Sequence, residues 1–353
     1  MSDISIEIIN EPTSEYIEFL GQADEAMLFQ EANYLKLISN IAQSQIFIFL
    51  ARNARKQVVG VLPAIMIDGK YGSILNALPF YGSHAGPVVT VQGDALVKLS
   101  QKFFSFSKEK NCATSTLICS PFMFLEKQKA LSEDCVVSYV DSRIGQMTYL
   151  PQVFLPDESL EDRLMSIFHS KTRNMVRKSQ KEGLVHQKGC NEKALAFLES
   201  THNDNMSVIG GTPKPREFFS GLKDTYIEGE QYQIYTAFDQ GEPVAALLLF
   251  YFNGIVEYFT PVIKKEARSK QPLSYLIFEA MIDAVKDGHN IWNWGGTHIN
   301  QESVYRFKKR WGAVDKEYLY LNKINDQNIL KIDPAELCYE YPFFYVYPFG
   351  KDN

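Results

Sequence analysis

One pattern of strands and a helix occurs twice in this chain and limits the folds open to it. The first copy begins near Gln45 and the second near Gln233, about 190 residues later. In each copy, two runs of β-branched and aromatic residues are joined by a turn. The second run ends at a hairpin dipeptide, Asp68-Gly69 or Asn253-Gly254. A third run, an amphipathic helix and a short final strand follow. This order predicts an α+β fold, a tandem duplication with mixed sheets flanked by helices.

The two copies correspond element by element. The first has predicted strands at 45–51, 57–67, 70–78 and 114–119 and a helix at 94–110; the second has strands at 233–239, 243–252, 255–262 and 290–294 and a helix at 272–286. Residues 160–222, between the copies, have helical spacing of apolar residues. We therefore predict two domains, residues 1–155 and residues 156–353, the second with a helical lead-in over about 156–230.

Composition excludes several classes of protein. Apolar residues make up 45% and charged residues 22% of the 353 positions, as in ordinary globular proteins. The net charge of −6 argues against a surface built to bind duplex DNA. The five cysteines form no C-x-x-C pair and are expected to be buried, reduced thiols. No apolar run reaches the length of a membrane span, so we expect a soluble, cytoplasmic protein.

The histidines are scattered singly, and no metal-protease or nucleotide-binding motif occurs. We therefore expect no metal site and no tightly bound cofactor.

A cationic helix is predicted over residues 170–183. Arg173, Arg177 and Lys181 are spaced at i, i+4 and i+8, which places three like charges on one face. One interpretation is a binding site for phosphate or another anion. The other is a solvated helix face near a C-terminus that favours cations.

A strand also runs into a glycine pair and then into a second cationic helix. Gly295 and Gly296 allow a ligand to approach the backbone, but a plain strand-to-helix turn fits as well. Residues 306–310 then carry four cations beside aromatic residues, which suits a phosphate-bearing partner or a solvated helix end. The loop 78–87, rich in glycine and aromatic residues, is either a binding loop or a structural turn.

Taken together, these segments resemble the Fem-type peptidyltransferases of the FemAB-like group. The resemblance covers roughly residues 29–321 and is most specific at the R-x-x-x-R-K-x-x-K-x-G helix (173–183), at the glycine pair, and at F-K-K-R-W-G (307–312). It implies two domains of the GNAT (N-acetyltransferase) fold. It also implies an acyltransferase in which an amine directly attacks an activated acyl donor and forms an amide. Known members transfer an amino acid from aminoacyl-tRNA to the peptide of a peptidoglycan precursor.

The resemblance leaves the donor open between aminoacyl-tRNA and acyl-CoA. Acetyl-CoA enzymes of this fold carry [RQ]-x-x-G-x-[GA] before the central helix, but residues 268–273 have Gln271 and Leu273 at the small positions. The long helical arm of some members that engage tRNA is missing from 160–222. The acceptor expected is a cell-wall or polysaccharide precursor that bears phosphate, either a nucleotide-sugar or a lipid-linked molecule. An acyl-CoA N-acyltransferase and a non-catalytic binding module remain as alternatives.

Individual roles follow from the chemistry and the resemblance. Glu257 or His298 is the candidate catalytic proton acceptor, and N–H groups around the glycine pair are candidate donors to the oxyanion. The residues predicted to bind substrate are Tyr81, Gly82, Ser83, His84, Arg173, Arg177, Lys178, Asn293, Gly295, Gly296, Thr297, Asn300, Arg306, Lys308 and Arg310. The aromatic tail 339–349 is expected to pack across one domain, with docking on a membrane as the alternative.

Overall fold

The computed structural model describes residues 4–77, 84, 86–90, 94–151, 159–298 and 300–346. The chain forms two compact units. Unit 1 comprises Met1–Gly145 and Lys316–Asn353, and unit 2 comprises Gln146–Asp315. The chain passes from one unit to the other within two long strands, β7 (Tyr139–Tyr149) and β13 (Val314–Ile324). We predicted domains of 1–155 and 156–353; by contacts, the segment from Lys316 onward belongs instead with unit 1, because β13 pairs with β6 of that unit.

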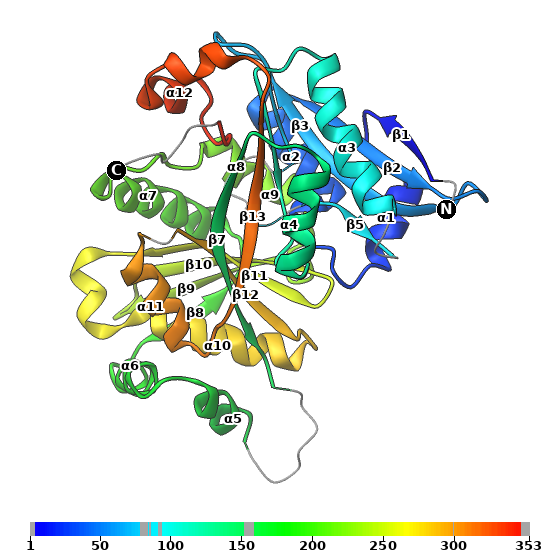
Figure 1. Cartoon of the computed structure of the whole chain (residues 1–353). Helices are drawn as coiled ribbons and strands as arrows, with labels where there is room; N and C mark the ends of the chain where they lie inside the picture. The colour runs from blue at the N-terminus through cyan, green and yellow to red at the C-terminus, as the bar shows by residue number, and fades with distance from the viewer. Residues whose placement is uncertain are drawn as a thin grey trace. The chain divides into compact units, whose positions relative to one another are not determined.

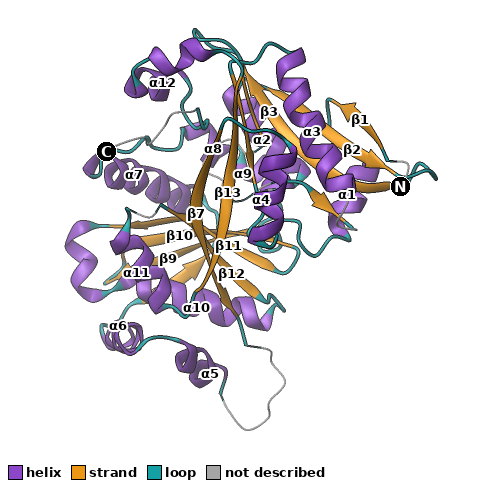
Figure 2. Cartoon of the chain, in the orientation of Figure 1, coloured by secondary structure: helices purple, strands orange, loops and turns teal. Residues whose placement is uncertain are grey.

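Unit 1 has an open sheet in the order β1-β2-β3-β4-β6-β13, and α3 packs along β2 and β3 (Figure 2). Its elements are β1 (Ser5–Ile9), α1 (Ser14–Gly21), a 3₁₀ turn (Leu28–Gln30), α2 (Ala32–Ala42), β2 (Gln45–Arg52), β3 (Val58–Ile67), β4 (Ile74–Asn76), β5 (Val88–Val89), α3 (Asp94–Glu109), β6 (Thr114–Ile118), α4 (Leu125–Asp134), a 3₁₀ turn (Gln327–Lys331) and α12 (Pro334–Glu340).

Unit 2 has strands in the order β12-β11-β10-β9-β8. Its elements are α5 (Leu160–Ile167), α6 (Ser170–Lys181), β8 (Val185–Lys188), α7 (Glu192–Val208), α8 (Arg216–Ser220), α9 (Leu222–Thr225), β9 (Tyr232–Asp239), β10 (Glu242–Phe252), β11 (Ile255–Ile263), a 3₁₀ turn (Lys265–Lys270), α10 (Pro272–Lys286), β12 (Ile291–Thr297) and α11 (Glu302–Arg310).

Strand pairing confirms the duplicated fold. β2 and β3 in unit 1, like β9 and β10 in unit 2, are antiparallel neighbours, and each second strand pairs with an antiparallel third strand. The third strand then pairs in parallel with the strand that follows the helix, β4 with β6 and β11 with β12. Each parallel ladder contains three residue pairs. The last pair is Asn76–Thr116 in unit 1 and Glu257–Asn293 in unit 2.

The two hairpins differ in their turns. Asn253 and Gly254 both have positive φ, 46° and 72°, as a two-residue hairpin requires, and β11 starts at once. In unit 1 the third strand is shorter than the predicted 70–78, because residues 68–73 form a longer connection before β4. The dipeptide Asp68-Gly69 therefore begins a loop and does not complete a tight turn.

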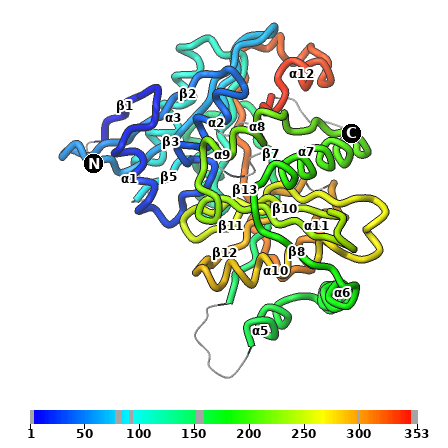
Figure 3. Tube along the Cα trace, turned by 180° about the vertical axis from the view of Figure 1, so that it is seen from behind, coloured from blue at the N-terminus to red at the C-terminus, as the bar shows by residue number. Residues whose placement is uncertain are grey.

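Helices cover both faces of the unit 2 sheet. On one face, α10 packs on β9, β10 and β11, and α6 packs on α10; on the other face lies α7 (Figures 1 and 3). The α10 face forms a hydrophobic core that includes Leu247, Leu249 and Trp292. The α7 face carries an aromatic group in which the ring of Phe250 lies 4.9 Å from that of Phe259 and 6.5 Å from that of Phe218.

The described part of the aromatic tail packs within unit 1. The Tyr341 hydroxyl donates to the Gly72 carbonyl at 2.7 Å, and the Tyr345 hydroxyl donates to Asp141 at 3.1 Å. The Tyr345 ring also lies 5.0 Å from that of Tyr320. Residues 347–349 lie outside the described residues. Packing within one domain is thus confirmed for the described tail, although in unit 1 and not in the predicted second domain.

Four of the five cysteines are buried and Cys338 is exposed, and none forms a disulfide. Burial raises the pKa of the Cys112 thiol to about 11, so this thiol stays protonated at neutral pH. Among the helices that the structure describes, none combines the length and the apolar character needed to span a membrane.

Candidate active site

The candidate site lies where β11 and β12 separate. Their parallel pairing ends at Glu257–Asn293, although β11 continues to Ile263 and β12 to Thr297. Just beyond this point β11 has a bulge: Tyr258 pairs with Leu249 and Thr260 with Leu248, so Phe259 has no partner on β10. The end of the ladder and the bulge together open the sheet next to Glu257.

Glu257 is the buried acid of this site. It is only 3% exposed, and its Oε2 accepts a hydrogen bond of 2.8 Å from the Asn293 amide. Its Oε1 has no hydrogen-bond partner among the described residues. Burial raises the pKa of Glu257 to about 8, against the smaller opposite effect of the Asn293 hydrogen bond. A carboxyl with a pKa near the working pH and one free oxygen is suited to accept or donate a proton.

The Asn293 side chain connects Glu257 to the glycine pair. Its Oδ1 accepts a hydrogen bond of 3.0 Å from the Gly295 N–H. Gly295 has φ +75°, a backbone conformation that favours glycine. The backbone conformation therefore explains why a glycine occupies this position. Because Asn293 already occupies the Gly295 N–H, this group is not free for the predicted oxyanion role in this conformation.

Lys308 reaches back from α11 to the same segment. Its Nζ donates to the Gly296 carbonyl at 3.0 Å and to the Thr297 Oγ1 at 2.8 Å, and lies 3.4 Å from the Gly295 carbonyl. The residue is 7% exposed, and burial lowers the pKa of its ammonium to about 8. Thr297 in turn donates to Gln146 at 3.2 Å. Lys308 therefore holds the end of β12 in place instead of extending into solvent.

The motif after Lys308 has a structural role. Trp311 is fully buried, with its ring 5.0 Å from that of Phe168. Gly312 has φ +80°, and a Cβ added there would lie 2.7 Å from the Ile167 carbonyl oxygen. Only glycine fits this position, so the W-G pair fixes the end of α11 against the segment between α5 and α6.

Cations of α6 and α11 lie near the place where the end of α11 contacts the segment that connects α5 to α6. The His169 N–H donates to the Arg310 carbonyl at 2.9 Å, and the Arg173 Nη1 donates to the Phe168 carbonyl at 2.8 Å. Arg177 and Lys178 are exposed on α6. Arg306 is exposed and forms an ion pair with Glu302.

The α6 cations lie on the other side of the sheet from Glu257. Glu257 is directly opposite Phe250 in the β10–β11 ladder, so both side chains point to the α7 face. Helix α6 packs on α10, which covers the opposite face (Figure 1). The structure therefore brings together six predicted residues and keeps the α6 cations apart from them. The six are Glu257, Asn293, Gly295, Gly296, Thr297 and Lys308.

His298 takes part in the turn that leads into α11. Its Nδ1 accepts a hydrogen bond from the Asn300 N–H at 3.2 Å, and its own N–H donates to Gln301 at 3.4 Å. No hydrogen bond between His298 and Glu257 occurs among the described residues. Glu257 is thus the better placed of the two predicted proton acceptors.

The predicted binding loop of unit 1 is described only in part. Tyr81, Gly82 and Ser83 lie outside the described residues. His84 is fully buried, with its ring 4.7 Å from that of Tyr318. In this conformation His84 therefore contributes to the core of unit 1 and not to an open surface.

Two notable residues were missed by the sequence reasoning. Lys214 is buried, with its Nζ 5.0 Å from the centre of the Phe259 ring on the α7 face, and burial lowers its pKa to about 7. Asn76 is fully buried, and neither polar atom of its side chain has a partner among the described residues. The observed register of the duplicated strands gives Asn76 the position that Glu257 has in unit 2. The strands predicted from the sequence, 70–78 and 255–262, do not align these two residues, so the sequence contained no signal for Asn76.

Comparisons with known proteins agree with this fold. Residues 170–309 match the acetyltransferase (GNAT) domain family. No curated protein matches the chain. Among solved structures, FemX is similar over 92% of this chain and 99% of its own, with 13% identity and a TM-score of 0.69.

Two further structures extend the likeness. The C-terminal domain of a putative lysylphosphatidylglycerol synthetase from Agrobacterium fabrum is similar over 94% of this chain and 96% of its own, with 11% identity and a TM-score of 0.56. A tandem GNAT protein from the clavulanic acid biosynthesis pathway is similar over 91% and 98%, with 11% identity and a TM-score of 0.51. The likeness to FemX and the domain match confirm the predicted resemblance and support the predicted enzyme class, an acyltransferase. The chain has a tandem GNAT fold, and its residues 170–309 match the acetyltransferase (GNAT) domain family.

Proposed function

We propose that this protein transfers an acyl or aminoacyl group to an amine of a cell-envelope or polysaccharide precursor. The observation that carries the proposal is the Glu257 carboxyl, buried at the point where the parallel strands separate. One of its oxygens is held by Asn293, and the other has no hydrogen-bond partner in the described part of the chain. The similarity of the fold to FemX supports a precursor of the peptidoglycan type.

In the proposed reaction the acceptor amine attacks the acyl carbon of the donor. A C–N bond forms, the bond from the acyl carbon to its leaving group breaks, and the amine loses one proton. The Glu257 carboxylate takes this proton and returns it to the leaving group, so no metal or redox partner is required. Because the pKa of Glu257 is about 8, the reactive carboxylate is the minor form at neutral pH.

The turn before α10 favours a donor other than acyl-CoA. Gln271 has φ +58° at the position where acetyl-CoA enzymes of this fold have glycine. Its side chain bonds within the turn, to the Arg268 carbonyl at 2.9 Å and to the Ser274 hydroxyl at 3.3 Å. A turn filled by its own side chain leaves less room for a pyrophosphate. We therefore propose aminoacyl-tRNA as donor, with acyl-CoA as the second candidate.

The exposed cations Arg177, Lys178 and Arg306 are proposed to contact the phosphates of the precursor or of tRNA. Arginine suits this role because its guanidinium forms two parallel hydrogen bonds with a phosphate. Arg177 and Lys178 lie on α6, and Arg306 lies on α11. These cations belong to the surface of unit 2 and not to the proton-transfer site.

The test begins with thermal-shift measurements on the full chain with CoA, aminoacyl-tRNA and UDP-sugar precursors. Stabilisation by tRNA and a precursor, but not by CoA, is the expected result. Amide formation is then measured with the stabilising pair. Glu257→Gln should lower kcat by about 100-fold or more, whereas the exposed control Glu266→Gln should not.

A non-catalytic binding module makes the opposite prediction. It gives no turnover with any donor, and Glu257→Gln and His298→Ala leave its ligand affinity unchanged. Stabilisation by CoA alone, with turnover, identifies instead an acyl-CoA N-acyltransferase.

A further inference from the structure

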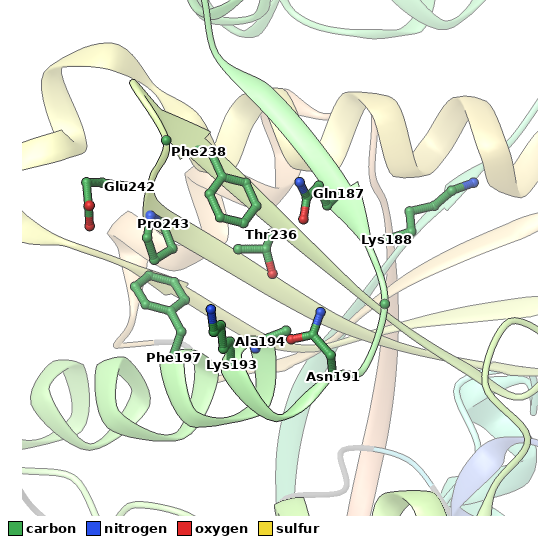
Figure 4. A pocket seen from close by; sticks show the side chains of 12 residues that line it. Gln187, Lys188, Asn191, Lys193, Ala194, Phe197, Thr236, Phe238, Glu242 and Pro243 are labelled. Carbon is green, nitrogen blue, oxygen red and sulfur yellow. Dashed lines mark hydrogen bonds between the residues drawn. The ribbon is translucent and has the colours of Figure 1, made fainter.

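A pocket of about 390 Å³ lies between α7 and the outer strands of the unit 2 sheet (Figure 4). Its residues come from β8, from the start of α7, from β9 and from the turn into β10. They are Gln187, Lys188, Gly189, Asn191, Lys193, Ala194, Phe197, Thr236, Phe238, Gly241, Glu242 and Pro243. Helix α7 contributes Lys193, Ala194 and Phe197 to this lining.

The pocket is separate from the candidate active site. Pro243 lies seven positions before Phe250 on β10, which at about 3.3 Å per residue is about 23 Å. Phe250 is the residue opposite Glu257. A ligand in this pocket therefore does not touch the proton-transfer group.

One part of the pocket wall is apolar. Phe238 on β9 pairs with Pro243 on β10, so both side chains point to the α7 face of the sheet. Figure 4 shows the rings of Phe197 and Phe238 on the same side of the pocket, next to Pro243. Two phenyl rings and a proline suit a ring or a short apolar chain.

The other part is rich in hydrogen-bond donors. Figure 4 shows Asn191, Thr236 and Gln187 on the side away from Pro243, and Lys193 between Asn191 and Phe197. Lys193 is exposed and forms no ion pair with any described residue. The Asn191 Oδ1 accepts from the Ala194 N–H at 2.9 Å, so the free part of that side chain is the donating NH₂ group.

Thr236 marks the base of this donor side. It is 3% exposed, and its hydroxyl has no hydrogen-bond partner among the described residues. Buried hydroxyls nearly always have one, so a partner from outside the chain would complete this position. Glu242, the acid of the pocket, lies beside Pro243 at the apolar end in Figure 4.

We propose that this pocket binds a small organic carboxylate with an apolar body. The carboxylate accepts hydrogen bonds from Lys193 and Thr236, and the apolar body lies against Phe197 and Phe238. A neutral molecule of the same shape lacks the charge that Lys193 selects, and a bare inorganic anion lacks the body that the rings select.

The test is calorimetric titration of the full chain with benzoate, benzamide and acetate. Benzoate should bind saturably. Benzamide should bind at least about tenfold more weakly because it loses a hydrogen bond to a charged group. Acetate should also bind at least about tenfold more weakly, because it lacks the apolar ring that would be buried against Phe197 and Phe238. Lys193→Gln and the near-isosteric Thr236→Val should each weaken benzoate binding about tenfold. Lys286→Gln is the matched control: Lys286 is an exposed lysine of α10, on the opposite face of the sheet, and is not one of the pocket residues, so this change should leave the affinity unchanged.

Thermal unfolding of each variant checks that it is folded. If Thr236→Val is unstable, Lys193→Gln alone decides the test, because Lys193 is exposed and its replacement should not affect folding. The proposal fails if benzoate does not saturate, if benzamide binds as tightly as benzoate, or if Lys193→Gln binds like the unmodified chain. None of these outcomes depends on acyl transfer or on Glu257.

Discussion

At the scale of single residues, the ionisation of Glu257 connects the proposed chemistry to stability. Its pKa in the folded protein, about 8, lies above the 4.5 of an ordinary glutamate. Between these two values the folded state binds more protons than the unfolded state. Linkage then requires that the contribution of Glu257 to stability falls as the pH rises through this window.

Glu257→Gln removes this ionisation and keeps the shape of the side chain. We expect the variant to gain stability relative to the unmodified protein as the pH rises from about 5 to 8, by an amount on the order of a few kcal/mol. Urea denaturation of both proteins at several pH values measures the difference. A difference that does not change with pH would show that Glu257 is not buried as an acid.

The buried amide of Asn76 permits a second prediction. Within the described segments this amide has no hydrogen-bond partner. A buried amide of that kind loses its hydration without compensation, so Asn76→Leu should leave the free energy of unfolding unchanged or raise it by about 1 kcal/mol. Asn322→Leu is the control: Asn322 is equally buried, but its amide bonds to the Thr116 hydroxyl at 2.8 Å and to the Tyr320 carbonyl at 3.2 Å. This control should lose about 1–3 kcal/mol. Equal losses in both variants would contradict the prediction.

At the scale of elements, Lys308 determines how α11 holds the end of β12. Lys308→Met keeps the length of the side chain and removes the hydrogen bonds to Gly296 and Thr297. We expect a lower kcat and a loss of about 1–3 kcal/mol in stability, because buried acceptors lose their donor. Lys309→Met is the matched control, since Lys309 is exposed and its ammonium pairs with Asp315 and, among the described residues, not with the β12 backbone. Equal behaviour of the two variants would mean that Lys308 does not hold this segment.

Gly312 tests the junction between α11 and the segment before α6. Gly312→Ala introduces strain at φ +80° and also a contact with the Ile167 carbonyl, so we expect a loss of about 2–4 kcal/mol. Gly241→Ala, at φ +87° with nothing within 4 Å of the added carbon, should lose only about 1–2 kcal/mol. Denaturant unfolding measures both losses, and a Gly312 variant no less stable than the Gly241 variant would exclude the contact.

Elements with local signals were predicted well. The apolar spacing of Leu276, Ile277 and Met281 placed α10 at its observed bounds, and Asn253-Gly254 placed the hairpin between β10 and β11. The burial of Lys308 could not be predicted. Residues 306–310 contain four cations, and such a run is typical of a helix face exposed to solvent. Only the tertiary contacts with Gly296 and Thr297 show that this member of the run is buried.

At the scale of the whole molecule, the duplicated order of elements could be predicted from the sequence. The unit to which the last strand, β13, belongs could not. The pairing of β13 with β6 joins residues about 200 positions apart, and no periodicity encodes such a contact. For this reason the prediction placed the segment from Lys316 onward in the second domain, whereas it belongs to unit 1.

The division of work between the units gives a further prediction. The proposal assigns proton transfer to unit 2, and unit 1 has the amide Asn76 where unit 2 has the acid. Asn76→Asp should therefore change kcat by no more than about twofold. Glu257→Asp should lower kcat about tenfold or more, because the shorter side chain moves the carboxyl. Steady-state kinetics with the donor and acceptor identified above measures both. A large loss of kcat from the Asn76 variant would show that unit 1 also takes part in the reaction.

The passage of the chain through β7 and β13 has a consequence for synthesis on the ribosome. Unit 2 is contiguous, so all of its residues have been made before Lys316 is added. The β6 edge of unit 1, by contrast, must wait without its neighbour while about 200 further residues are translated. The half of the protein that is translated first is therefore the last to be completed, and in the meantime its open strand edge is exposed to aggregation or to chaperones.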